Sequence, residues 1–352
     1  MMNSSPLTPS GQILRLNAEE TEQLGRPAAA SLDVLRDSGA LALRTPLEYG
    51  GEWADAPAAV RRLAELGRGC PSAAWVAATS ATAKTLLAQG LGADAHKEVF
   101  GDPDSLACGS GHPSGRGVRE AGGVRVSGQW DNVSGCEAAA WANLAVMVDD
   151  TYHVAAVPLG DLRVERNWHM AGMRGTGSQR LVADGLLIPA HRIAPGGPPR
   201  RQDQLFFALC LLAPVVGGAR GALDTVEEMF RSGRKPYMTG YAGMGDSPGA
   251  RHWLARAAWL VERAERTALT TAQDSTREDL DEAAGARLRA GMADAAKDCR
   301  DAVELMLDLH GAAGFRETNA LQRYWRDIAV AGRHPLLCGY LAAENLGTAL
   351  VS

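Results

Sequence analysis

The sequence lacks the cysteine patterns that would crosslink a fold or hold a metal ion. Its 352 residues include 6 cysteines, which are widely scattered. They form no C-x-x-C and no His/Cys cluster at the spacing of a zinc site. We therefore expect no metal site and free, mostly buried thiols in a reducing, cytoplasmic setting. These cysteines are Cys70, Cys108, Cys136, Cys210, Cys299 and Cys338.

The sequence also lacks a signal peptide and an uninterrupted run long enough to span a bilayer. Its N-terminus has no basic region followed by an apolar stretch. The most apolar tract, 205–222, is broken by Pro214, Gly217, Gly218 and Arg220, which favours a buried core helix. A net charge of −5 disfavours a nucleic-acid or anionic-membrane surface. We therefore expect the protein to bind neither nucleic acid nor membrane.

A nucleotide-binding fingerprint is missing as well. Dinucleotide sites of the common type need a strand, a G-x-G-x-x-G turn and a helix in that order. The glycines of 109–115 have the wrong spacing, and Pro113 interrupts them. The glycines of 172–177 are not followed by a helical pattern. The sequence therefore offers no visible site for a pyridine nucleotide.

The patterns that are present divide the chain into three parts. Apolar residues recur at helical spacing before residue 100 and again after residue 205, whereas alternating apolar and polar residues lie between. A chain of 352 residues is also too long for one small core. We predict an α+β, mostly helical fold. Its parts are a helical domain at 11–104, an antiparallel β-domain at 105–197 and a four-helix bundle at 203–352.

Turn signals place the strands of the β-domain. Gly122–Gly123 predicts one turn, and Asp149–Asp150 predicts a hairpin between 144–148 and 153–157. A further strand pair is expected around Asp184–Gly185.

Two short glycine-rich segments, 128–141 and 168–178, predict the wall of a pocket for a planar aromatic ligand. Indole rings supply flat apolar surface, hydroxyl groups supply small donors, and glycines let backbone amides come close. The alternative is a β-domain core in which tryptophans only fill space. The side chains concerned are Trp130, Trp141, Trp168, Ser134, Thr176 and Ser178.

These motifs, taken in order, resemble the acyl-CoA dehydrogenase superfamily over residues 12–350. The likeness is greatest to the two-component monooxygenases (hydroxylases), which use reduced flavin delivered by a separate reductase. The matching segments are T-P-L-E-Y-G-G at 45–51, G-C-P-S-A-A-W-V at 69–76, G-Q-W with S-G and W at 128–141, W and G-M-R-G-T-G-S at 168–178, H-G-x-x-G-F at 310–315, Q-R-Y-W-R-D at 322–327 and G-R-H at 332–334.

The resemblance implies a flavoprotein fed with reduced FMN or FAD by an NAD(P)H:flavin reductase. It implies O2 as co-substrate, and a homotetramer or at least a homodimer, because the turn at 310–315 would meet the flavin of a neighbouring subunit. A small substrate of secondary metabolism fits this family. The residues that the resemblance places at the flavin are Ser110, Trp130, Ser134, Trp168, Thr176, Ser178, His310, Gly311, Gly314 and Arg326.

The resemblance also bears on catalysis. Many superfamily dehydrogenases carry a glutamate base after the R-D helix, but this chain has His334 there, and Glu344 lies further along on a different expected helix. Histidine titrates near neutral pH and can pass a proton either way. We therefore predict His334 as catalytic acid/base and Ser134 as a hydrogen-bonding partner of the flavin, with Arg326 orienting the C-terminal segment. The alternative for His334 is a helix cap or an interface residue just before Pro335.

One departure keeps other functions open. Related oxygenases often carry a histidine where this chain reads A-T-A-K at 81–84. A flavin-dependent dehydrogenase or oxidase is therefore one alternative, and a flavin-free binding protein that kept the fold is another. The substrate, expected to be a phenol, a polyketide-like aromatic or an amine, is not chosen by any motif. Residues 76–86 or 237–247 are expected to shape that choice.

Overall fold

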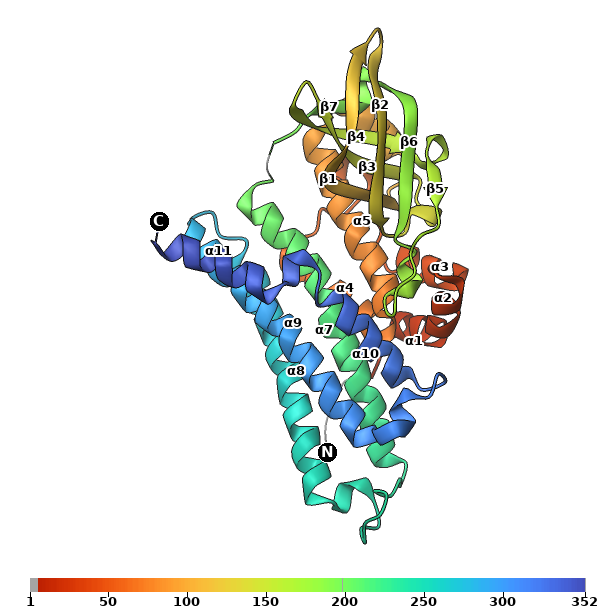
Figure 1. The fold of residues 1–352 in the computed structure, drawn as a ribbon, viewed down its shortest axis with the longest axis vertical. Coiled ribbons are helices and arrows are strands. Elements are labelled where there is room, and N and C mark those ends of the chain that lie inside the picture. The colour runs from red at the N-terminus through yellow and green to blue at the C-terminus, as the bar shows by residue number, and fades with distance from the viewer. Residues whose placement is uncertain (1–5, 198, 352) are drawn as a thin grey trace.

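The computed structural model describes residues 6–197 and 199–351, and the chain runs from helices through a sheet to helices again (Figure 1). The sheet forms one end of the molecule and long helices form the other, with the N-terminal helices packed at their junction. This arrangement confirms the predicted α+β, mostly helical fold. The limits proposed for the three domains stay predictions.

The N-terminal part of the chain contains one helix that is buried on nearly all sides, α5. Asp55 caps α4, because its carboxylate accepts a hydrogen bond from the backbone N–H of Ala58 at 2.8 Å, and Pro57 lies in the first turn. Helix α5 is buried on nearly all sides and packs against α4, α7 and strand β1. The N-terminal helices are α1 (Pro9–Leu16), α2 (Ala18–Leu24), α3 (Ala29–Asp37), α4 (Ala56–Gly69), α5 (Pro71–Gly90) and α6 (Ala93–Val99).

The strands of the described chain form one seven-stranded sheet in the order β5-β6-β2-β1-β3-β4-β7. All its pairings are antiparallel except that of β1 with β3, which is parallel. The expectation of an antiparallel domain therefore holds apart from this central pair. The strands are β1 (Ala107–Glu120), β2 (Gly123–Val133), β3 (Trp141–Val148), β4 (Thr151–Pro158), β5 (Arg163–Glu165), β6 (Gln179–Pro189) and β7 (Ile193–Pro195).

The turns of the sheet agree with the sequence in two places and differ in one. Gly122 has φ of 89° between β1 and β2, and Asp149 and Asp150, both at positive φ, connect β3 to β4 as predicted. The strand pair expected around Asp184–Gly185 is wrong, because β6 continues through it. The register against β2 shifts there, and Gly185 N donates to Ser127 Oγ at 2.9 Å. A β-bulge explains the turn-like residues inside one strand.

The C-terminal helices form the bundle, which also contains the apolar tract 205–222. Helix α7 is the one described helix long and apolar enough to cross a membrane, yet 89% of its most apolar window is buried inside the protein, as expected for a core helix. Helix α11 projects from the body (Figure 1). The elements are α7 (Arg201–Arg231), α8 (Pro248–Asp274), α9 (Glu282–His310), α10 (Ala320–Ala331), the 3-10 turn η8 (Pro335–Leu337) and α11 (Gly339–Val351).

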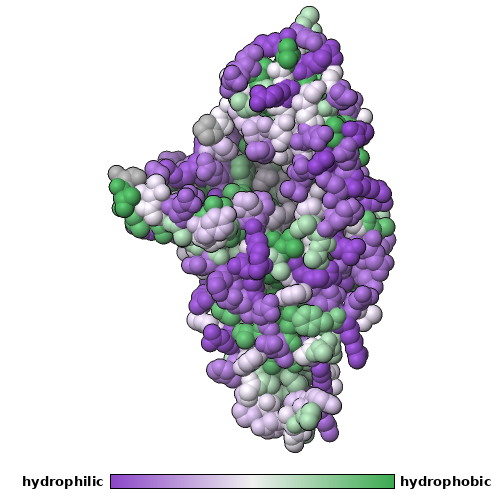
Figure 2. Space-filling model, viewed as in Figure 1, coloured by the Kyte–Doolittle hydropathy of each residue, from purple (hydrophilic) through white to green (hydrophobic). Residues whose placement is uncertain are grey.

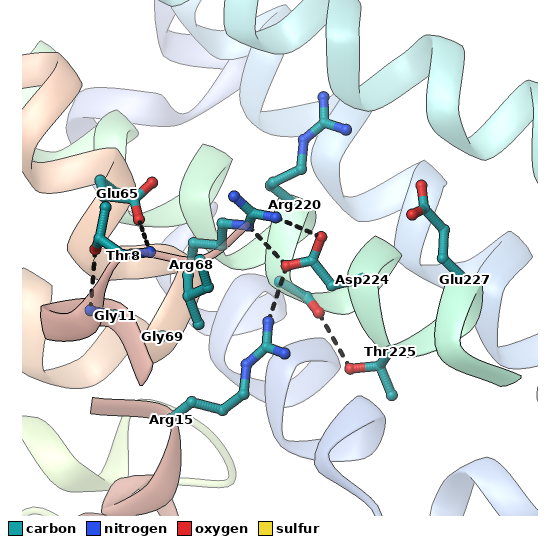
Figure 3. Close-up of polar contacts among 12 residues, drawn as sticks. Thr8, Gly11, Arg15, Glu65, Arg68, Gly69, Arg220, Asp224, Thr225 and Glu227 are labelled. Atoms are coloured by element: carbon teal, nitrogen blue, oxygen red, sulfur yellow. Dashed lines mark hydrogen bonds and ion pairs between the residues drawn. The ribbon is translucent and has the colours of Figure 1, made fainter. Parts of the chain in front are cut away.

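A buried ion-pair cluster joins the N-terminal helices to the bundle (Figure 3). The carboxylate of Asp224 on α7 accepts two hydrogen bonds from Arg68 on α4, from Nε at 2.7 Å and from Nη2 at 2.9 Å. Arg15 on α1 donates a third from Nη2 at 2.8 Å. Because Asp224 and Arg68 are almost fully buried, each charge depends on the other for compensation.

We predict that Asp224→Ala destabilises the fold, since it leaves two guanidinium groups without their shared carboxylate. Loss of one partner of a buried pair costs about 3 to 5 kcal/mol. Urea unfolding measures the effect, and Asp33→Ala is the control, because the Asp33–Arg36 pair is exposed and should contribute less than about 1 kcal/mol. Equal losses in the two variants would show that the cluster does not hold these helices together.

Candidate active site

A pocket of about 1210 Å³ lies where the sheet meets the bundle. Its walls come from α5, from the start of β1, from the segments 131–134 and 168–178, from α7, and from residues 330–336. Figure 2 shows a recess on the surface between the sheet and the bundle. The pocket brings together six of the residues predicted at the site, which are Ser110, Ser134, Trp168, Thr176, Ser178 and His334.

Three hydroxyl groups on one wall form a chain of hydrogen bonds whose direction is fixed. Thr176 Oγ1 lies 2.8 Å from the carbonyl oxygen of Met173, which can only accept, so Thr176 donates its proton there. Ser178 Oγ, at 2.6 Å, must then donate to Thr176, and Ser134 Oγ, at 2.8 Å, must donate to Ser178. Ser134 therefore presents only lone pairs to the pocket and accepts hydrogen bonds from a ligand.

Met173 is held from both sides. Its backbone N–H donates to Asp327 Oδ1 on α10 at 2.5 Å, and its carbonyl oxygen also accepts from Trp168 Nε1 at 2.9 Å. Met173 has φ of 55°, a left-handed conformation that is costly for a residue with a side chain. Ser72 Oγ donates to Asp327 Oδ2 at 3.3 Å. Asp327 is thus a positioning residue for Met173, and through it for the hydroxyl chain.

The opposite wall carries His334. Its Nδ1 accepts a hydrogen bond from Leu336 N at 3.2 Å, so the neutral ring carries its proton on Nε2. Burial and the charge of Arg289 lower the pKa of His334 to about 4. The ring packs edge-on against Trp75, with 5.7 Å between centroids. His334 is therefore both the cap of η8 and a pocket residue, and its neutral ring can donate from Nε2. Its role as catalytic acid/base stays a prediction.

Two of the three predicted indole walls lie outside the pocket. Trp130 is completely buried, donates from Nε1 to Ala145 O at 2.9 Å, and covers Gly115 inside the sheet. Trp141 is half-buried and faces the guanidinium of Arg192, which is 5.2 Å from the ring centroid. Both fill the core of the β-domain, the alternative left open by the sequence. Trp130 is therefore corrected from a cofactor-binding to a packing residue.

Arg326 also lies outside the pocket lining. It forms an ion pair with Glu22 on α2, donates from Nε to Gln322 at 2.8 Å and donates from Nη1 to Ala171 O at 2.7 Å. Gly172 beside it leaves no room for a side chain, since an added Cβ would lie 2.0 Å from the carbonyl oxygen of Arg326. Within this chain Arg326 clamps the 168–178 segment onto α10 and is not placed to bind the cofactor.

The turn at 310–315 is remote from this pocket within one chain. His310 and Gly311 line a separate depression of about 610 Å³ together with Arg234 and Trp253, whereas Gly314 packs against His310. Burial and the charge of Arg234 lower the pKa of His310 to about 4. The contact of His310, Gly311 and Gly314 with a neighbouring subunit's flavin stays a prediction.

Several pocket residues were not singled out from the sequence as site residues. Phe207 and Leu211 come from a helix with no readable motif, whereas Trp75 and Met173 lie inside quoted motifs without having been assigned to the site. Thr79, Thr82 and Leu86 lie in the segment 76–86 that was expected to influence substrate choice. The segment 237–247 contributes nothing to this lining. Ala83, in the segment where related oxygenases often carry a histidine, is buried and does not supply a polar group to the pocket. The further lining residues are Trp75, Met173, Phe207 and Leu211.

The support of Met173 can be tested with two variants of Asp327. Asp327→Ala leaves the buried N–H of Met173 without an acceptor, which costs about 1 to 3 kcal/mol. Asp327→Asn keeps an acceptor and should retain most of the stability. Because Met173 O holds the indole of Trp168, the Ala variant should also shift the tryptophan emission, and the Asn variant should restore it. Identical spectra for all three proteins would contradict this role for Asp327.

The charge state of His334 can be tested by pH titration. Because its pKa is depressed, the His334 ring stays neutral in the folded protein between about pH 4 and 6.5, whereas in the unfolded chain the same ring takes up a proton in this range. This contribution to stability is present above pH 6.5 and is lost as the pH falls toward 4. The NMR signal of the His334 ring, assigned by its disappearance in His334→Gln, should show no midpoint between pH 5.5 and 8. A midpoint near 6.5 would contradict the depressed pKa and would favour the acid/base role of His334.

Comparison with known proteins identifies the family. The family described as acyl-CoA dehydrogenase, C-terminal domain, matches residues 209–337. A pigment production hydroxylase of Rhodococcus sp. (strain ATCC 21145) is 31% identical over 94% of this chain and 91% of its own. The oxygenase component of an FADH2-dependent resorcinol hydroxylase of Rhizobium sp. (strain MTP-10005) is 29% identical over 92% of this chain and 87% of its own.

A solved structure agrees in fold over the whole chain. XiaF from Streptomyces sp., in complex with FADH2 and glycerol, superposes with a TM-score of 0.89 at 28% sequence identity, covering 97% of this chain and 92% of XiaF. The resemblance inferred from the motifs is thereby confirmed. The chain belongs to the acyl-CoA dehydrogenase superfamily, in its branch of flavin-dependent two-component monooxygenases, as an oxygenase component.

Proposed function

We propose that this protein binds reduced FMN or FAD supplied by a separate NAD(P)H:flavin reductase and hydroxylates a small aromatic substrate with O2. The relatives named above are hydroxylases, one of them FADH2-dependent. Reduced flavin, when bound, supplies the two electrons that let one oxygen atom enter the substrate while the other leaves as water. A homodimer or homotetramer in the cytoplasm belongs to the same proposal.

The observation that carries the proposal is the polarity of the hydroxyl chain. Since Ser134 Oγ can only accept from a ligand, it suits a ring N–H. A reduced isoalloxazine carries N–H where the oxidised ring has a bare nitrogen, so the wall fits the reduced cofactor better. Trp168 and Met173 add apolar surface beside these hydroxyls, and the pocket is large enough for a tricyclic ring together with a small substrate.

The other wall suits a substrate oxygen. His334 keeps Nε2–H available near neutral pH, because Nδ1 is occupied by Leu336 N. Such a donor can hold a phenol oxygen or a phenolate in one orientation. Trp75, Phe207 and Leu211 surround this side with apolar surface that excludes water. Substrate orientation and water exclusion are therefore the tasks that the chain's own residues perform.

The lining of the pocket disfavours α-proton abstraction, which is the reaction that a flavin-dependent dehydrogenase would catalyse. Among the described lining residues the one carboxylate is Asp131, and it is already engaged by Arg180 at 2.7 Å and by Asn167 at 3.0 Å. Glu344, the first acid after His334 in the sequence, is exposed on α11 and does not line the pocket. A base for an acyl thioester is therefore not in place.

Anaerobic titration with flavin in both redox states tests the proposal. Wild type should bind the reduced flavin more tightly by about tenfold, the value of one well-matched hydrogen bond. Ser178→Ala frees the Ser134 hydroxyl to donate, so this preference should fall toward unity. Ser114→Ala is the matched control, because Ser114 lines the pocket outside the hydroxyl chain. With reduced flavin and 18O2, a phenolic substrate should gain one labelled atom.

Each rival gives a different result in these experiments. A flavin-free binding protein would show no titration in either redox state. A dehydrogenase or oxidase would hold oxidised flavin at least as tightly and would bleach on addition of an acyl thioester. Either outcome would overturn the monooxygenase assignment. If Ser178→Ala keeps the preference for reduced flavin, the monooxygenase function is still supported. In that case the hydroxyl chain is not the cause of the preference.

A further inference from the structure

Helix α5 turns one narrow face toward the pocket, and that face carries two threonines. Over residues 71–87 the side chains of α5 that stay partly exposed are Thr79, Thr82 and Leu86. They recur at intervals of three and four residues, which is the spacing of one helix face, and all three line the pocket. The other residues of this stretch are buried, so the surface of α5 that a ligand can touch consists of these side chains and Trp75.

The hydroxyl protons of both threonines point back into the helix. Thr79 Oγ1 donates to the carbonyl oxygens of Trp75 and Val76, each at 3.1 Å. Thr82 Oγ1 donates to the carbonyl oxygen of Thr79 at 2.7 Å. Because a carbonyl oxygen only accepts, each hydroxyl keeps its lone pairs available for a donor. Within residues 6–197 and 199–351 no such donor reaches either threonine.

Thr85, on another face of the same helix, shows what such a hydroxyl does when a donor is present. Its Oγ1 donates back to Ala81 O at 2.8 Å and at the same time accepts from Arg44 Nε at 3.0 Å. A threonine that is bonded back to its own helix thus still accepts a second hydrogen bond from outside. At Thr79 and Thr82 the described chain supplies no donor, and the space in front of them is the pocket.

His334 gives the same side of the pocket the opposite polarity. Its ring packs against Trp75, and the neutral ring can donate from Nε2. Thr79 and Thr82 follow Trp75 by one and two turns of α5, which corresponds to about 6 and 10 Å of helix rise. Apolar side chains of α7, which packs against α5, also line this side. A donor therefore lies at one end of an apolar slot, and two acceptors lie further along it.

We propose that Thr79 and Thr82 are specificity-determining residues that accept a hydrogen bond from the substrate. The donor is an O–H or N–H group at the end of the aromatic substrate that is remote from the oxygen held by His334. This inference deepens the proposed function and rests on it. It narrows the substrate to aromatics with two polar ends, such as a dihydroxyarene or a hydroxylated N–H heterocycle. An ether or a ketone at the far end would place lone pairs against lone pairs, so such compounds are disfavoured.

The reduced flavin also carries N–H groups and is a second source of a donor. The two sources share their chemistry but meet different walls. The hydroxyl chain proposed to contact the flavin ring belongs to the β-domain, whereas Thr79 and Thr82 belong to α5. Flavin titration of threonine variants isolates the cofactor, and titration with matched aromatic probes isolates the substrate.

The test is anaerobic calorimetric titration of the full-length protein with saturating reduced FMN, repeated without flavin. The probes are hydroquinone and 2,6-dihydroxynaphthalene, each compared with its parent phenol and with its monomethyl ether. Two ring lengths are used because the two acceptors lie at different distances along α5. In at least one series the diol should bind about five- to tenfold more tightly than both comparators, the gain expected from one neutral hydrogen bond.

Variants of the two threonines assign this preference to their hydroxyl groups. Thr79→Val/Thr82→Val keeps the side-chain shape and removes both acceptors, so the diol should lose its advantage. Thr79→Ser/Thr82→Ser keeps the hydroxyls and should retain the preference. Thr225→Val is the matched control and should also retain it, because Thr225 donates back to Gly221 O at 3.1 Å on α7 but does not line the pocket.

The outcomes separate this inference from the function on which it rests. The proposal is wrong if wild type binds the diols no better than their comparators, if the valine variant keeps the preference, or if the serine variant loses it. If the valine variant weakens reduced flavin while the diol keeps its advantage, the donor is the flavin. If wild type binds no reduced flavin, the monooxygenase proposal fails, whereas the diol comparison is still measured without flavin. A preference that the valine variant alone loses, with normal flavin binding, supports both.

Discussion

The backbone of Met173 is the point on which the geometry of the pocket depends. Its N–H is fixed by a carboxylate of the bundle, Asp327, and its carbonyl oxygen anchors both the indole of Trp168 and the hydroxyl of Thr176. A residue in a left-handed conformation persists only when its surroundings over-determine it. Here the determining contacts come from two parts of the fold at once. The wall contributed by the β-domain is therefore set by a helix that lies over a hundred residues away in sequence.

A fixed carbonyl at one end gives the hydroxyl chain its polarity. Hydroxyl groups are ambivalent, because each can donate or accept, and a free serine in a pocket would adapt to either redox state of a flavin. Anchoring Thr176 on an acceptor removes that freedom for Ser178 and then for Ser134. On the proposed function, selectivity for a protonated ring nitrogen would arise without a charged group in contact with the ring. It depends on the order of three neutral side chains.

The sequence predicted the succession of elements and most of the hydroxyl wall, because glycine turns, helix caps and ordered motifs are local signals. It could not separate Trp130 from Trp168, since both are tryptophans in glycine-rich segments, yet Trp130 is buried on strand β2 and Trp168 lies in the loop after β5, where it lines the pocket. The bulge in β6 was predicted as a turn, because Asp and Gly are typical of both. Lys84 is fully buried and donates to the backbone of Leu41 and of Pro103; no pattern in the sequence announces such a contact, because its acceptors lie in two separate loops.

His334 shows why residue type alone does not define a catalytic role. Imidazole in a flavin pocket suggests proton transfer, but the backbone N–H of Leu336 occupies Nδ1, and burial beside a guanidinium keeps the second proton away. Turning the ring over would leave that N–H without its acceptor, so the cap also locks the tautomer. This structural hydrogen bond thereby makes Nε2 the donor of the neutral ring. On the proposed function, the pocket would present a fixed N–H to the substrate and a fixed lone pair to the cofactor, two opposite polarities built from uncharged groups.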